Sequence, residues 1–155
     1  MMTTGVCKTR LKECLLMVLI AASISCFPIV SSQATENQAV MKIRVEANGQ
    51  FTVFELNDSP AAKELYGQLP LEIKVEDYGG LEKIFYPPQK LSTTATPLVG
   101  KAKPGTLAYY APWGDVVMFH KKFGSAAGLY ELGEAISGEE HIQRMSGSLR
   151  ITQEK

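Results

Sequence analysis

Apolar and polar side chains alternate along the chain shortly after residue 40. Between residues 41 and 47 every second side chain is apolar, and residues 51–56 resume an apolar stretch after Asn48-Gly49. A period of two gives a strand one apolar face and one wet face. Asn-Gly favours a tight hairpin turn because both positions tolerate positive φ. The pattern therefore predicts a β-hairpin over residues 41–56.

Six further stretches are predicted as strands from alternation, or from short apolar runs between turn residues. They cover residues 71–76, 81–86, 106–110, 116–120, 129–132 and a last strand that begins near residue 149. Residues 77–80 contain two glycines and are expected to form a turn, while residues 89–103 are expected to form a loop.

Two short helices are predicted from their start signals. Residues 57–60 place small polar side chains before Pro60, which suits the first turn of a helix, and Gly67 ends it. Ser137 and Glu140 have the spacing of a capping box, in which the serine caps the helix start. About eight strands and two short helices favour a closed barrel or a sandwich over a parallel α/β sheet.

Residues 1–34 differ from the rest and are interpreted as a secretory signal peptide. A basic start precedes an uncharged apolar run at residues 15–24, and Ser32 and Ala34 suit a signal peptidase. The run is shorter than the ~20 residues that a membrane-spanning helix needs. We therefore expect cleavage after Ala34, a short linker at residues 35–40 and one domain at residues 41–155. An uncleaved membrane anchor is the less favoured alternative.

Cys26 offers a second processing route, because the residues before it weakly resemble a bacterial lipobox. The membrane would then be contacted through a lipid anchor rather than only through the signal peptide. All three cysteines, Cys7, Cys14 and Cys26, lie in the front segment. Cleavage after Ala34 would leave no cysteine for a disulfide, a thiolate nucleophile or a metal site.

Composition and the absence of known motifs argue against several classes of function. The 16 basic and 16 acidic residues give a formal net charge of zero, which argues against a nucleic-acid binder. No hydrolase elbow, phosphate loop or dinucleotide fingerprint occurs, so no cofactor is expected. The two histidines, His120 and His141, are on different predicted elements, and no metal site is expected. We expect His141 at the surface and His120 facing water at the end of its strand.

Residues 107–115 combine the only tryptophan, Trp113, with the pair Tyr109-Tyr110. Adjacent strand residues point to opposite faces, so one tyrosine faces inward and the other outward. Trp113 falls in a turn and is expected at the rim. An aromatic rim of this kind either binds an apolar ligand or packs as a lid over the barrel end.

Three blocks of sequence carry a family resemblance. They are Leu-Glu-Lys-Ile at 81–84 with Tyr-Pro at 86–87, the run Pro-Gly-Thr-Leu-Ala-Tyr-Tyr-Ala-Pro-Trp-Gly-Asp at 104–115, and Phe119 with Leu-Gly at 132–133. Together they resemble a family of small bacterial cyclophilin-like domains of unassigned function, over residues 41–153. The resemblance implies a closed eight-stranded cyclophilin-like β-barrel with a short helix at each end.

True cyclophilins, which are peptidyl-prolyl isomerases, are more distant. Residues 104–107 and 117–119 are similar to two of their segments, which implies that Phe119 takes the place of a pocket phenylalanine. Their Phe-His-Arg motif, whose arginine stabilises the twisted amide, has no counterpart here, and no arginine occurs between Arg44 and Arg144. The nearest cation, Lys83, lacks the planar fork of a guanidinium. The resemblance therefore implies the fold and a concave face, not the activity.

The favoured hypothesis is a non-enzymatic binding domain, exported to the periplasm or secreted, whose ligand is an unknown peptide or small molecule. Its groove is expected to be lined by Tyr109, Trp113 and Phe119, with Glu82, Lys83 and His120 as polar neighbours. The alternative is a peptidyl-prolyl cis-trans isomerase that acts on exported proteins. A third hypothesis is a hydrolase or isomerase in which His120 works with a carboxylate such as Asp115.

Overall fold

The computed structural model describes residues 40–155. They belong to a compact unit that extends from Asn37 to Lys155. The predicted signal peptide, its cleavage point after Ala34 and the lipidation route at Cys26 lie outside the described residues. Among residues 40–155, no helix combines the length and the apolar character that crossing a membrane requires.

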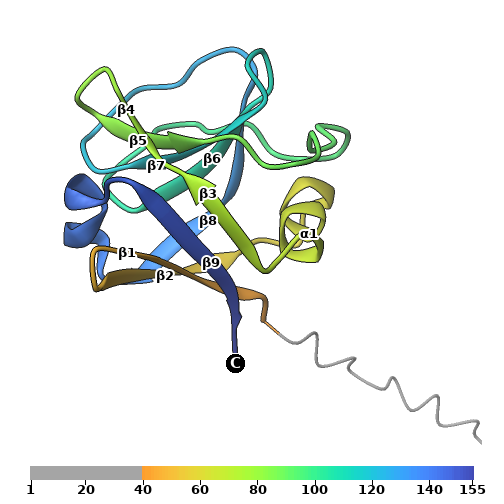
Figure 1. Ribbon diagram of the computed structural model, residues 1–155. Helices are drawn as coiled ribbons and strands as arrows, with labels where there is room; N and C mark the ends of the chain where they lie inside the picture. Colours follow the sequence, from red (N-terminus) through yellow and green to blue (C-terminus); the bar gives the residue numbers. More distant parts are fainter. Residues whose placement is uncertain (1–39) are drawn as a thin grey trace, which may run out of the picture. The chain divides into compact units, whose positions relative to one another are not determined.

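Nine strands form one antiparallel sheet, which curves around itself in Figure 1. They are β1 (Lys42–Ala47), β2 (Gln50–Leu56), β3 (Leu71–Lys74), β4 (Glu76–Tyr78), β5 (Glu82–Phe85), β6 (Thr106–Tyr110), β7 (Asp115–Phe119), β8 (Leu129–Ser137) and β9 (Ser148–Glu154). The order across the sheet is β3-β9-β1-β2-β8-β6-β7-β5-β4. The predicted hairpin is confirmed, because Asn48 and Gly49 both have positive φ between β1 and β2.

The two ends of this order, β3 and β4, are separated along the chain by Val75 alone. β3 pairs with β9, β4 pairs with β5, and the Val75 amide donates a hydrogen bond to the Gly147 carbonyl at 3.0 Å. The chain therefore brings the two ends of the sheet together at Val75 and nearly closes the barrel. The predicted barrel class is confirmed, but the strand count of eight was too low. The alternation predicts one strand over residues 71–76, whereas the structure has two strands, which are separated by Val75 and pair with different partners.

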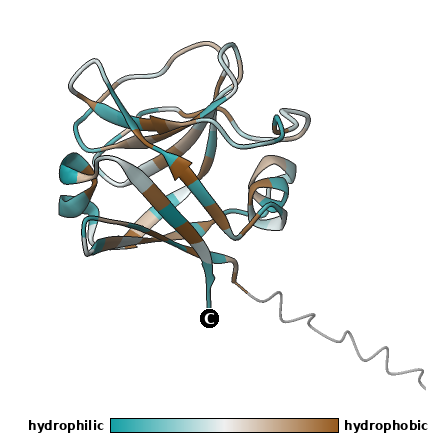
Figure 2. Ribbon diagram, viewed as in Figure 1, coloured by the Kyte–Doolittle hydropathy of each residue, from teal (hydrophilic) through white to brown (hydrophobic). Residues whose placement is uncertain are grey.

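The main hydrophobic core fills the barrel interior. It takes alternate residues from the strands, such as Ile43 and Val45 on β1, and Leu149 and Ile151 on β9. Hydrophobic and hydrophilic bands alternate along β9 in Figure 2, as expected for a strand with one buried face. This alternation is the feature that made the strands predictable.

Helix α1 (Pro60–Gly67) begins as predicted. The Ser59 hydroxyl accepts a hydrogen bond from the Ala62 amide at 3.3 Å, and Pro60 occupies the first turn. Helix α1 buries Ala61, Ala62 and Leu65 in the main core.

The second helix, η1 (Glu139–Arg144), differs from its prediction. It is a 3₁₀ helix that starts after Gly138, and no side chain caps it. The expected capping box is therefore wrong. Ser137 cannot cap the helix because β8 continues through it and pairs it with Val53 on β2. Ile142 nevertheless reaches the main core, so both helices close gaps in the barrel.

Candidate functional site

The outer face of β5, β6 and β7 carries a second, smaller apolar cluster. On β7, Val116 and Met118 point into the barrel, while Val117 and Phe119 point outward. Two loops, one containing Ala102 and the other containing Phe123, cover this outer face. The Ala102 amide donates to the Gly124 carbonyl, and the Phe123 amide donates to the Ala102 carbonyl, both at 3.0 Å. These reciprocal bonds fix the loops against each other and hold a wall over the strands.

A cavity of about 210 Å³ lies on this outer face. It is lined by residues of β4 to β7, of the turn between β6 and β7, and of the chain from Phe123 to Leu129. Its aromatic lining consists of Tyr78, Tyr110, Trp113, Phe119 and Phe123. The Trp113 ring meets Tyr78 and Tyr110 edge-on, at centroid distances of 4.9 and 5.4 Å, and Phe119 stacks on Phe123 at 5.5 Å. The rings support one another, so the cavity is shaped without a ligand.

Trp113 is positioned by the turn between β6 and β7. The Tyr110 carbonyl accepts hydrogen bonds from the amides of Trp113 and Gly114, at 3.3 and 2.8 Å. Gly114 has φ of 78°, a conformation that glycine adopts at low cost. Trp113 remains 48 % exposed, and it therefore forms part of the cavity's mouth rather than of its floor.

Asp115 contributes a carboxylate that is 1 % exposed, at the first position of β7. Its Oδ1 atom has no hydrogen-bond partner among the described residues. Burial raises the pKa of Asp115, while a hydrogen bond from its own backbone amide opposes the rise. An unpartnered buried oxygen costs stability, and in a cavity wall it is an open acceptor for a ligand.

Glu82 on β5 also lines the cavity. Burial, followed by the negative charge of Asp115, raises the pKa of Glu82 to about 7. The charge of Asp115 therefore acts on Glu82, and near neutral pH Glu82 exchanges between its neutral and charged forms.

Three of the residues expected at the site line this cavity, namely Glu82, Trp113 and Phe119. Tyr109 does not, because it faces the barrel core, where its hydroxyl accepts a hydrogen bond from the Leu91 amide at 3.3 Å. Its neighbour Tyr110 lines the cavity instead. The alternation predicts that the two tyrosines face opposite sides of the strand. Which of them faces the cavity depends on the register that pairs Tyr110 with Asp115.

Lys83 and His120 do not line the cavity. The Lys83 side chain is 4 % exposed, and its Nζ lies 2.7 Å from Asp77 Oδ1. Both ring nitrogens of His120 are enclosed and have no hydrogen-bond partner among the described residues. The expectation of a water-facing His120 is therefore wrong for these atoms. Burial, together with the charges of Lys121 and Lys83, lowers the pKa of His120 and keeps the ring neutral.

A catalytic pair of His120 and Asp115 is not formed. Neither Asp115 Oδ1 nor either His120 nitrogen has a partner, so no hydrogen bond joins them through these atoms. The arginines on either side of the long arginine-free stretch lie elsewhere. The Arg44 guanidinium stacks on Phe51 at 3.4 Å, and Arg144 Nε donates to Gln50 Oε1 at 3.2 Å. Within residues 40–155, no three His, Cys, Asp or Glu side chains are grouped to hold a metal ion.

Sequence reasoning missed Tyr78, Tyr110 and Phe123, and it treated Asp115 only as a possible partner of His120. Tyr78 had been placed in a turn, but it ends β4 and pairs with Glu82. Phe123 belongs to a covering loop, where no periodic pattern indicates which way a side chain points. Pairing and loop closure, which bring these residues together, depend on contacts between distant parts of the chain.

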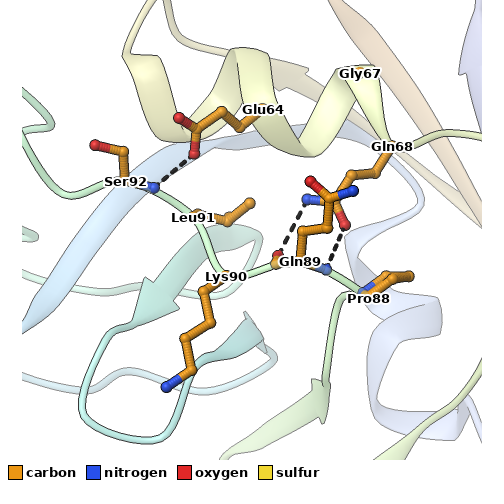
Figure 3. Close-up of a pocket in the computed structure, with 8 residues that line it drawn as sticks. All are labelled: Glu64, Gly67, Gln68, Pro88, Gln89, Lys90, Leu91 and Ser92. Carbon is orange, nitrogen blue, oxygen red and sulfur yellow. Dashed lines mark hydrogen bonds between the residues drawn. The ribbon is translucent and has the colours of Figure 1, made fainter.

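A larger and more open hollow of about 670 Å³ lies between the end of α1 and residues 88–92 (Figure 3). Much of its polar lining is already bonded within the chain. The Gln68 side chain exchanges two hydrogen bonds with the Gln89 backbone, at 3.0 and 3.1 Å, and the Ser92 amide donates to Glu64 Oε2 at 2.6 Å. The aromatic cavity therefore has the stronger chemical case as a site.

The fold and the cavity define a small β-barrel with an aromatic pocket on its outer surface. A model of the cyclophilin-like family matches residues 45–154, and the chain belongs to that family. Its fold is similar to the solution structure of a hypothetical protein from Archaeoglobus fulgidus. That match has a TM-score of 0.58 and 16 % identity, and it covers 76 % of this chain and 98 % of the other. No curated protein matches the sequence.

Proposed function

We propose that this chain is an exported cyclophilin-like binding domain that holds one side chain or one small molecule in its aromatic cavity. The observation that carries the proposal is the cavity itself, in which five aromatic rings surround two carboxyl groups. Aromatic walls with a few convergent polar groups are typical of small-ligand sites. Export is inferred from the apolar run at residues 15–24 and the small residues before position 35.

The size of the cavity limits the ligand. Drug-sized ligands usually occupy pockets of roughly 300–1,000 Å³, whereas this cavity measures about 210 Å³. A single amino-acid side chain, or a molecule of similar size, fits that space. The bonds that fix the covering loops preorganise the cavity and reduce the entropy lost on binding.

The proposal is tested with the twenty N-acetyl amino-acid methylamides as probes. Trp113 is the only tryptophan, so its emission reports on the cavity mouth alone. At least one probe is expected to shift the emission saturably and to raise the melting temperature. Ala126→Phe should abolish the response by filling the cavity, whereas Ala127→Phe, at the exposed neighbouring position, should preserve it. If none of these probes, and no free amine or alcohol of similar size, alters either signal, the proposed function is wrong.

The proposal also predicts that the protein lacks prolyl isomerase activity. The cavity lining contains carboxyl groups and no guanidinium, so it lacks the charged, planar donor with which an arginine stabilises a twisted amide. A protease-coupled assay with a proline tetrapeptide should give the uncatalysed rate. A higher rate that disappears in Phe119→Ala would instead favour the isomerase alternative.

A further inference from the structure

The cavity has an unbalanced charge. Its two ionisable acids are Glu82 and Asp115, and none of its lining residues is a lysine, an arginine or a histidine. Neither acid forms an ion pair with another residue in the described part of the chain. The nearest buried cation, Lys83, is already paired with Asp77 at 2.7 Å.

Asp115 supplies an independent indication of a ligand. It is 1 % exposed, it lines the cavity, and its Oδ1 is enclosed without a donor. Buried carboxylates are normally satisfied by donors, because the loss of water is otherwise uncompensated. A ligand group that donates hydrogen bonds and carries positive charge would satisfy both the oxygen and the charge.

The aromatic walls favour the same kind of ligand. The faces of Trp113, Tyr78 and Tyr110 carry the negative side of their ring quadrupoles, and a cation near such faces is stabilised. Trp113 and Tyr78 meet almost at right angles, with planes 85° apart, so the two rings form a corner rather than a flat stack. A corner of rings beside two carboxyl groups suits a small organic cation.

We infer that the cavity binds a protonated alkylamine, such as the side chain of a lysine, with the ammonium group at Asp115 and Glu82 and the alkyl chain against the aromatic rings. The ammonium supplies three donors, of which one reaches Asp115 Oδ1, and the apolar stem replaces water along Val117 and Phe119. This inference rests on the proposed function, because it names the chemical class of the ligand in the same cavity.

The test compares matched probes through Trp113 emission and calorimetry. The cationic probes are N-acetyl-lysine methylamide and n-butylammonium, and the neutral counterparts are N-acetyl-norleucine methylamide and n-butanol. Each cation is expected to bind at least about tenfold more tightly than its neutral counterpart. Binding of the lysine derivative alone would indicate a peptide ligand, binding of n-butylammonium alone would indicate a free amine, and either result supports the inference.

Charge-removing variants assign the effect to the cavity. Asp115→Asn keeps the shape of the side chain and should weaken cation binding at least about tenfold, with little change for the neutral probes. Glu82→Gln, at a less buried position, should act in the same direction and serves if Asp115→Asn fails to fold. Glu72→Gln removes an equal charge from β3, outside the cavity, and should leave binding unchanged.

The binding function and the alkylamine inference are overturned by different results. Equal binding of cationic and neutral probes, or cation binding that survives both Asp115→Asn and Glu82→Gln, overturns the alkylamine inference while the binding function stands. A cavity that accepts none of the N-acetyl amino-acid methylamides, and neither n-butylammonium nor n-butanol, overturns both.

Discussion

Two residues set the chemistry of the cavity, and their environments differ. Asp115 is fully enclosed, while Glu82 is only half-buried, yet both pKa values are raised mainly by burial. A carboxyl group whose pKa is about 7 changes its charge within the physiological range. The fold therefore holds a titratable group in a state that it would not adopt in water, as is common at functional sites.

This shift predicts a dependence of stability on pH. The pKa of Glu82 rises from 4.5 in its ordinary state to about 7 in the folded protein, so the protonated form favours folding. The contribution is complete below pH 4.5 and is lost as the pH rises through 7. Because solvent screens the half-buried group, the loss is on the order of 1 kcal/mol.

Urea unfolding between pH 5 and 8 checks the effect. The free energy of unfolding should fall more steeply with pH in the wild type than in Glu82→Gln, and the difference between the two profiles reports the Glu82 shift. The lowered pKa of His120 gives a slope of opposite sign that both proteins share. The raised pKa of Asp115 acts in the same direction as that of Glu82, and Glu82→Gln retains this contribution. A wild-type profile as flat as that of Glu82→Gln would contradict the assigned shift.

The two predicted helix caps, at Ser59 and Ser137, differ in outcome because of the elements around them. Ser59 precedes Pro60 outside any strand, so its hydroxyl is available to cap α1. Ser137 has an equally favourable local sequence, but it belongs to β8, where it pairs with Val53 on β2. A capping signal read from four residues cannot show whether a neighbouring strand extends into it, and this is why the second helix was predicted less well than the first.

The two serines provide a matched pair of mutations. Ser59→Ala removes the acceptor for the Ala62 amide and should lower the free energy of unfolding by about 1 kcal/mol. Ser137→Ala removes no cap from η1 and should change it by less than about 0.5 kcal/mol. Chemical denaturation of both variants measures the difference, and an equal loss in the two would show that Ser137 acts as a cap after all.

At the scale of the whole molecule, one barrel supports two apolar layers. The interior core joins strands from all around the sheet, while the outer cluster depends on β5, β6, β7 and the start of β8. The strands between these layers are buried on both sides, which places the cavity on a rigid floor.

Gly133 lies on β8 between β2 and β6. A Cβ atom there would collide with the Glu55 carbonyl oxygen and would lie 2.9 Å from the Leu56 Cα. Gly133→Ala is therefore expected to destabilise the barrel by about 2–4 kcal/mol, since the backbone must move to make room. Gly100→Ala, with nothing within 4 Å of the added atom and no positive φ, is the control and should be close to neutral. Thermal unfolding that is unchanged in Gly133→Ala would show that β8 can retreat from β2.

The class of the fold was predictable because alternation at β1, β3 and β9 reports directly on the buried face of each strand. The interruption at Val75 was not predictable, since an apolar residue between two charged ones looks the same inside one strand and between two strands with different partners. In the cavity, Trp113 and Phe119 were found from their types and positions. Tyr110 and Phe123 required the register of β6 with β7 and the tie between the two covering loops, which only tertiary contacts specify.

Closure at Val75 has a further consequence for recognition. The free edges of the sheet belong to β3 and β4, strands of four and three residues. Edges this short offer few unpaired backbone groups on which a foreign segment could be added as an extra strand. Under the proposed binding function, recognition would then depend on the side chains that a partner inserts, because the sheet edges present so little main chain for it to align with.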